Sequence, residues 1–245
     1  IGVVEVSPEV RERLHHELRV RCFGSPAQAA PFGDLLVMAV KPQQMRAAAE
    51  QVAPNLSGQL VVSIAAGTRL TDLSRWLGGH QLLVRCMPNT PALIGAGVTA
   101  VYAAPGVGEA QRASAAQVLE AVGMVLWVKA EGLLDPVTAV SGSGPAYVYY
   151  FIEAMQQAAT ELGLSPEQAR TLSLQTFLGA ARLAAGSPDP AVRAITTISL
   201  PERMAKCAAS PVSPVRVSST GVASARKEFS SSAPAASVNS PLPMR

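Results

Sequence analysis

Three successive apolar runs of this sequence are each followed by a short segment whose residue types could bind a ligand. The segments are Lys41-Pro42-Gln43, Ala65-Ala66-Gly67-Thr68 and Met87-Pro88-Asn89-Thr90-Pro91. In an open parallel sheet, ligands bind outside the carboxyl ends of the strands. Small residues let a flat nucleotide lie against the backbone, Lys41 could donate to a ribose or nicotinamide group, and Thr68 starts a predicted helix whose N-terminus could hold an anion. The spacing therefore predicts a nucleotide cofactor along one edge of a sheet.

Each segment also has an ordinary structural interpretation. Ala65-Ala66-Gly67 is a common turn between a strand and a helix, Lys41 can be a solvated loop lysine, and Pro88-Asn89-Thr90-Pro91 can be a rigid turn. Short motifs of this kind have modest specificity one at a time. Their position after three successive strands favours the cofactor interpretation.

The dinucleotide fingerprint itself is not found in a suitable context. Gly95-Ala96-Gly97-Val98-Thr99-Ala100 matches its letters, but a predicted strand follows where a helix should, so we expect a turn. Gly142-Ser143-Gly144 fails for the same reason. The segment 1–6 would be the second strand of such a fold, so that the first strand and its glycine loop would lie before Ile1. Glu5 could then bind a ribose 2′-hydroxyl, which would favour NAD over NADP, although a solvated glutamate before a helix is at least as good an interpretation.

Acid–base and metal chemistry are not expected, and we assign no catalytic side chain. His15, His16 and His80 lie on a predicted surface helix and at a helix end, and Asp135 and Glu153 look isolated. If the chain is a reductase, its acceptor should need little protein acid. A cyclic imine fits because its nitrogen can arrive already protonated, so that the cofactor carries the chemistry and the protein supplies position.

Strands and helices alternate through the first half of the chain. Apolar runs predict strands at 1–6, 35–40, 60–64, 82–87, 98–103 and 124–128, and capping residues and periodicity predict helices at 8–18, 43–52, 68–77 and 109–122. This order is typical of a doubly wound parallel α/β sheet. Both faces of such a sheet are covered, which explains the continuous apolar runs.

The second half is predicted to be all-helical. Ala139-Val140-Ser141-Gly142-Ser143-Gly144-Pro145-Ala146-Tyr147 reads as a tight connection into a buried helix, and a second capping box at Ser165 opens a helix to about Ala185. Beyond residue 193 the sequence is rich in serine and proline, and we expect disorder. The predicted domains are therefore 1–129, 130–192 and a tail at 193–245.

Composition excludes several classes of function. The 245 residues carry a net charge of +3 without a basic cluster before residue 193, which argues against nucleic acid. No run approaches the roughly 18 apolar residues of a membrane span, and the start of the chain lacks the features of a signal peptide. Cys22, Cys86 and Cys207 form no paired framework, which favours a reducing compartment, and Cys86 is expected to be a small core residue.

Four motifs, in order, resemble the pyrroline-5-carboxylate reductase family over residues 1 to 192. They are Ala39-Val40-Lys41-Pro42-Gln43, Ser63-Ile64-Ala65-Ala66-Gly67, Arg85-Cys86-Met87-Pro88-Asn89-Thr90-Pro91 and Ala139–Tyr147, and the helix Gln175–Ala181 is similar as well. The resemblance implies a Rossmann domain that binds NADPH or NADH, followed by a helical domain that dimerises by intertwining. It implies a cytoplasmic homodimer or higher homo-oligomer that reduces 1-pyrroline-5-carboxylate to L-proline.

The resemblance also implies the site residues. Val40, Lys41, Pro42, Ala65 and Ala66 would line the cofactor, with Asn89 near the nicotinamide. Ser143 and Gly144 would bind the substrate close to the domain junction.

The chain departs from the family pattern in two places. The family's first strand with its glycine loop, and its later glycine-rich loop that holds the substrate carboxylate, have no counterpart here, and a shift of reading frame near residue 192 is one explanation. Two alternatives therefore stay open. One is an inactive chain that only associates with intact partners. The other is a related NADP-dependent reductase of another substrate, against which the Ser141–Tyr147 string argues.

Overall fold

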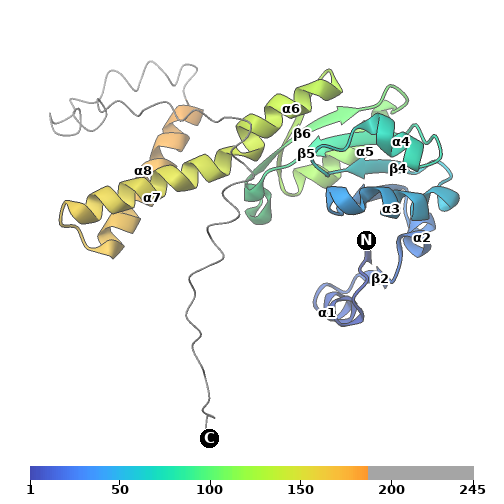
Figure 1. Ribbon diagram of the computed structural model, residues 1–245, viewed down its shortest axis with the longest axis horizontal. Coiled ribbons are helices and arrows are strands. Elements are labelled where there is room, and N and C mark those ends of the chain that lie inside the picture. Colours follow the sequence, from blue (N-terminus) through green and yellow to red (C-terminus); the bar gives the residue numbers. More distant parts are fainter. Residues whose placement is uncertain (187–245) are drawn as a thin grey trace, which may run out of the picture. The chain divides into compact units, whose positions relative to one another are not determined.

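A five-stranded mixed sheet forms the centre of the computed structural model, which describes residues 1–186 (Figure 1). Its strands follow one another in chain order: β3 (Leu35–Met38), β4 (Leu60–Ser63), β5 (Leu83–Met87), β6 (Gly97–Ala103) and β7 (Gly123–Trp127). The predicted fold class is confirmed, with one departure from the all-parallel expectation. β6 runs antiparallel to β5, while all other pairs in this sheet are parallel. The connection 88–96 is shorter than the dozen or so residues that a parallel crossover needs.

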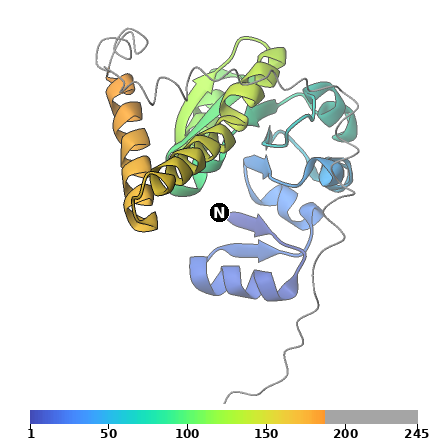
Figure 2. The ribbon, with the colours of Figure 1, turned by 60° about the vertical axis from the view of Figure 1, so that its left-hand side comes forward.

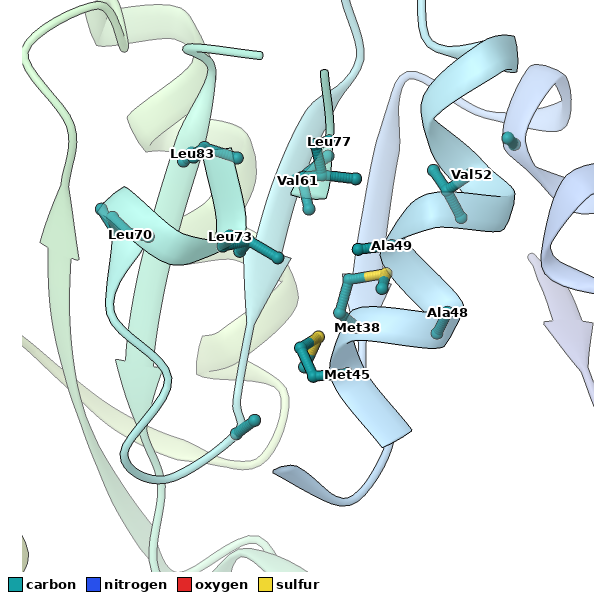
Figure 3. Packing of buried hydrophobic residues seen from close by; sticks show 12 residues of the cluster. Met38, Met45, Ala48, Ala49, Val52, Val61, Leu70, Leu73, Leu77 and Leu83 are labelled. Carbon is teal, nitrogen blue, oxygen red and sulfur yellow. The ribbon is translucent and has the colours of Figure 1, made fainter. Parts of the chain in front are cut away.

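Helices cover both faces of this sheet. On one face α3 (Pro42–Val52) and α4 (Leu70–Trp76) pack on β3 to β5, and Figure 3 shows Met45 and Ala49 on the side of α3 that faces the strand of Val61. On the other face α5 (Glu109–Glu120) packs on Leu60, Val62 and their neighbours. All four residues of β4 are buried, as the continuous apolar run predicts for a central strand.

A separate two-stranded parallel sheet precedes the large one. β1 (Gly2–Val4) pairs with β2 (Arg21–Phe23), and α1 (Pro8–Leu18) connects them (Figure 2). The start of α1 is confirmed, since the Ser7 hydroxyl accepts a hydrogen bond from the Val10 amide at 3.4 Å. The strand prediction at 1–6 was too long, and β2 was not predicted because three residues are too few for a periodic signal.

Short elements join these layers. They are α2 (Pro26–Ala29), η1 (Ala30–Phe32), η2 (Ala53–Asn55) and η3 (Thr90–Ile94). The predicted helix at 68–77 begins later than expected, because Arg69 is the N-cap residue of α4 and Thr68 lies buried ahead of it.

The helical segment begins after β7 and continues through the glycine–serine motif. It comprises η4 (Glu131–Leu133), α6 (Leu134–Val137), η5 (Thr138–Gly142), α7 (Gly144–Glu161) and α8 (Pro166–Ala185). η5 is a π-helical turn. The motif Ala139–Tyr147 therefore continues the helical segment through a widened turn, where we expected a tight connection between two domains. Such turns occur often at functional sites.

The apolar helix α7 is not buried in this chain. None of its residues, all of which the structure describes, falls in the buried class, and the side chains of Tyr147, Tyr149, Tyr150 and Phe151 are more than half exposed. The expectation of a buried helix is therefore wrong for the single chain. Residues Ile1–Gly179 form one compact unit. The predictions for 193–245 lie outside the described residues, and no helix among those described is long and apolar enough to cross a membrane.

Candidate active site

The turn after β4 exposes a stretch of backbone. The Ser63 hydroxyl, buried at the end of the strand, accepts a hydrogen bond from the Ala65 amide at 3.3 Å and so shapes the turn. Ala65 is buried, whereas Ala66 and Gly67 are exposed. Gly67 has φ of +75°, and no described atom lies within 4 Å of a β-carbon built on it. Only glycine adopts this backbone conformation at little cost, so the residue types give a turn that a ligand can approach closely.

The N-terminus of α4 is already occupied by a carboxylate. The Leu70 amide donates to Glu131 Oε1 at 2.8 Å, and Thr68 makes no cap. The expected anion site at Thr68 is therefore wrong. A helix of seven residues with a protein carboxylate at its first turn does not present that end to a ligand.

The residues predicted after β3 lie at the start of α3. Val40 is half-buried against the core, Lys41 is the exposed N-cap residue, and Pro42 is the first residue of the helix. Proline suits this position because its missing N–H has no partner in a first turn. The Ile64 amide donates to the Met38 carbonyl at 3.3 Å, which ties the carboxyl ends of β3 and β4 together.

Asn89 follows β5 and is held by its own side chain. Its Oδ1 accepts from the Val98 amide at 2.9 Å, which links the strand end to the first residues of β6. This bond leaves the side-chain amide nitrogen to donate to a ligand. Gly95, with φ of +70°, ends η3, and β6 begins at Gly97, so only the start of the Gly95–Ala100 motif is a turn and the expectation that a strand follows is confirmed.

The three loops share one edge of the sheet. β3, β4 and β5 are mutually parallel neighbours, so their carboxyl ends point the same way. The structure therefore places the loops that carry Lys41, Ala65 and Asn89 at one edge of the sheet, the edge at which open parallel sheets bind ligands.

The π-turn lies against the end of β5. The Ser143 amide donates to the Thr138 carbonyl at 2.9 Å, and a β-carbon on Gly142 would lie 2.8 Å from Met87 Cε. Gly142 thus permits a close approach between the helical segment and the strand that leads to Asn89. No described atom lies within 4 Å of a β-carbon built on Gly144. The predicted substrate residues Ser143 and Gly144 accordingly follow a turn packed on the cofactor edge.

Charged residues that sequence reasoning missed lie beneath this junction. The side chain of Arg85 is 4% exposed, and its Nη1 donates to Glu131 Oε1 at 3.0 Å. Asp135, expected to be isolated, lies 2.6 Å from Arg69 Nη2 and 3.8 Å from Arg85 Nη2. The available signal was an arginine inside the apolar run 82–87.

Glu5 and Cys86, the other residues that the sequence analysis discussed, both have local structural roles. Glu5 Oε1 accepts from the Ser7 amide at 2.9 Å, which accounts for Glu5 locally and leaves ribose binding a prediction. Burial raises the pKa of the Cys86 thiol to about 12, so its assignment to the core is confirmed. Within residues 1–186, no group of histidine, cysteine and carboxylate side chains is placed to hold a metal ion.

The sheet and its edge define a class of protein. A Rossmann-like sheet with close-approach turns at its carboxyl edge, joined to a helical segment, is the architecture of the NAD(P)-dependent oxidoreductases. Two family models match the sequence: the NADP oxidoreductase coenzyme F420-dependent model at residues 1–67, and the pyrroline-5-carboxylate reductase dimerisation model at residues 131–204.

Curated relatives and solved structures narrow the class. Pyrroline-5-carboxylate reductase of Pseudomonas aeruginosa is 47% identical over 180 residues, which are 73% of this chain and 66% of the relative. That of Vibrio alginolyticus is 40% identical over 77% of this chain and 70% of its own. A pyrroline-5-carboxylate reductase structure from Coxiella burnetii has a TM-score of 0.77 at 36% identity, covering 85% of this chain and 78% of that one. A Plasmodium falciparum pyrroline carboxylate reductase with NADP bound has a TM-score of 0.72 at 29% identity, covering 82% and 74%.

The chain belongs to the pyrroline-5-carboxylate reductase family. The matched segments span about two thirds of the length of the two curated relatives.

Proposed function

We propose that this chain is an NADPH- or NADH-dependent reductase of 1-pyrroline-5-carboxylate that forms L-proline. The observation that carries the proposal is the packing of Gly142 against Met87. This contact places the π-turn, with Ser143 next to it, beside the strand end that bears Asn89. Family membership supplies the chemical identity of the substrate, and the shared edge supplies a place where cofactor and substrate can meet.

The residues at this edge fit a dinucleotide. In this proposal Val40, Lys41 and Pro42 line one side of the cofactor and Ala65 and Ala66 line the next, and the open surroundings of Gly67 support it. We assign Asn89 as a donor to the nicotinamide carboxamide, since the Val98 amide occupies its Oδ1 and leaves its Nδ2 to donate. The cofactor, when bound, supplies hydride.

The chain's own residues then orient the acceptor. Ser143 offers a hydroxyl, and Gly144 offers backbone that no described side chain covers. None of the assigned site residues is a histidine or a carboxylate, which suits an imine that arrives protonated. The protein contributes proximity, and effective molarities for well-oriented reactants can be large, about 10⁵ M or more.

The exposed aromatic residues of α7 support self-association. Tyr149 and Tyr150 are 63% and 70% exposed, and a monomer rarely leaves such a patch in water. We place the association surface on the helical domain, residues 130–192, and the cofactor site on residues 1–129. A cytoplasmic homodimer or higher homo-oligomer that binds no nucleic acid completes the proposal.

The test is turnover by the purified chain. NADPH absorbance is followed with 1-pyrroline-5-carboxylate, and proline is quantified by mass spectrometry. We expect proline equimolar with oxidised cofactor, and Asn89→Ala to lose at least about tenfold in kcat/KM, as for the loss of one positioned donor. Asn55→Ala, at the end of η2, is the matched control. A folded chain that makes no proline would contradict the proposal.

The exposure of α7 also supports a second candidate, a chain that only associates. Co-expression with a tagged, full-length reductase distinguishes the two. Association without turnover by the chain alone would favour this second function.

A further inference from the structure

A buried arginine, Arg85, belongs to a charge network that joins strand β5, the turn 65–69 and the start of the helical segment. Arg85 lies on the central strand β5, between β4 and β6, and only 4% of its side chain is exposed. A buried guanidinium is costly unless its charge is paired and its donors are used. Its partners Glu131 and Asp135 both belong to the start of the helical segment.

Glu131 links the helical segment to the turn 65–69, which we call the cofactor turn because the proposed function assigns Ala65 and Ala66 to the cofactor. Its Oε1 accepts from Arg85 Nη1 at 3.0 Å and from the Leu70 amide at 2.8 Å. Leu70 is the first residue of α4, directly after the turn 65–69. One carboxylate oxygen therefore joins β5, the turn that carries Ala65 and Ala66, and the helical segment.

Asp135 adds a second, more exposed connection. It receives a hydrogen bond from Arg69 Nη2 at 2.6 Å and faces Arg85 Nη2 at 3.8 Å. Its side chain is 55% exposed, whereas that of Glu131 is 20% exposed. The network thus has a buried end at Glu131 and a solvent-facing end at Asp135.

The opposite end of the same segment contacts the same face of β5. Residues two apart on a strand point to one side, so Arg85 and Met87 share a face. Arg85 binds the beginning of the segment, and Met87 contacts Gly142 at the end of the π-turn. Two points of attachment along one rigid strand define the position of the residue that follows, Ser143, relative to Asn89.

We propose that Arg85 is a positioning residue, which through Glu131 and Asp135 holds the π-turn and the substrate residues in register with the cofactor turn. As a statement about substrate binding, this rests on the proposed function. A fork of guanidinium donors suits the task because it reaches two carboxylates at once, which a lysine ammonium does not do in the same geometry.

The network predicts separable effects of its two ends. Asp135→Asn weakens the exposed end, including the bond to Arg69, and leaves Glu131 in place on Arg85 and the Leu70 amide, so the start of α4 stays tethered while the π-turn loosens. Arg85→Met removes both contacts of the guanidinium and leaves the Leu70–Glu131 and Arg69–Asp135 hydrogen bonds in place. The matched control is Asp72→Asn, which breaks the exposed Arg75–Asp72 pair of 2.7 Å on α4 and touches neither loop.

Amide hydrogen exchange of the full chain without ligand is the first measurement. In Asp135→Asn we expect exchange at residues 134–144 to quicken about two- to fivefold, the range of a solvent-facing ion pair, with the Leu70 amide, which Glu131 still holds, and the unfolding midpoint unchanged. In Arg85→Met residues 134–144 and the Leu70 amide quicken by more than about tenfold, because the half-buried Glu131 carboxylate loses its charged partner. Should that variant fail to fold, Asp135→Asn decides.

Steady-state kinetics is the second measurement. We expect Asp135→Asn to raise the KM for 1-pyrroline-5-carboxylate about two- to fivefold and to leave the KM for NADPH at the wild-type value. A merely structural role would move both constants or neither. The proposal is overturned if exchange at 134–144 is unchanged, rises evenly along the chain, or rises equally in Asp72→Asn. A wild-type chain without turnover defeats the proposed function, and the exchange data still decide whether the network holds the π-turn.

Discussion

Gly67→Ala separates the conformational role of the cofactor turn from its role in binding. The φ of +75° costs an L-residue with a β-carbon about 1–2 kcal/mol. Alanine recovers about 0.4–1 kcal/mol by restricting the unfolded chain. Because no described atom lies within 4 Å of the added β-carbon, no clash is added, and the net loss of unfolding free energy is at most about 1.6 kcal/mol.

Gly78→Ala is a control matched in backbone geometry. Gly78 has φ of +69° and the same open surroundings, but it follows α4 at the end away from the cofactor turn. Both variants should lose the same unfolding free energy in urea. Gly132→Ala has open surroundings and no positive φ, so it should lose none.

Cofactor binding then distinguishes the two glycines. If the dinucleotide lies against the backbone at Gly67, the added methyl group occupies its place. NADPH fluorescence titration should give a Kd at least about tenfold higher for Gly67→Ala, equivalent to about 1.4 kcal/mol. Gly78→Ala should bind as wild type does. Equal NADPH affinity in all three variants would refute the assignment of this turn to the cofactor.

Three further outcomes test the core, the thiols and the helical domain. Leu73→Ala, at a fully buried position, should lower the unfolding free energy in urea by about 2–5 kcal/mol, whereas Leu93→Ala, 89% exposed, should change it by less than about 0.5 kcal/mol; equal losses would contradict the packing. Burial raises the pKa of Cys86 from 9.0 to about 12, so the unfolded chain releases this proton first as pH rises. The resulting stabilisation of the folded chain is complete below pH 9 and is lost as pH rises through about 12. Cys86→Ala should remove this pH dependence of the unfolding free energy. An alkylating reagent should label the half-buried Cys22 before the buried Cys86. Tyr150→Glu should weaken self-association at least about tenfold in sedimentation velocity, while an unchanged oligomer would place the interface elsewhere.

Sequence reasoning succeeded where a signal is local. The run Leu60–Ser63 predicts a strand buried on both faces, because every residue in it is apolar or small, and β4 is such a strand. Ser7 and Pro8 predict the start of α1 for an equally local reason. The common edge of the loops after β3, β4 and β5 also followed from strand order, since parallel strands present their carboxyl ends together, and cofactor binding at this edge stays a prediction.

Predictions failed where the outcome depends on distant residues. Thr68 looked like a helix cap, but Glu131, far along the chain, bonds the first turn instead. Asp135 looked isolated because its partners Arg69 and Arg85 are remote in sequence. α7 looked buried because hydrophobicity reports a preference for burial and does not say whether the same chain supplies the cover.

The sequence by itself therefore determined the order of strands and helices, the common edge of the three loops and the family. These depend on periodicity, on capping and on short motifs, all of which act within a few residues. Only the tertiary structure decided the packing of Gly142 against Met87 and the charge network around Arg85. Each of these requires two segments to meet in space, and their contacts form only when the sheet brings β5 against the helical segment.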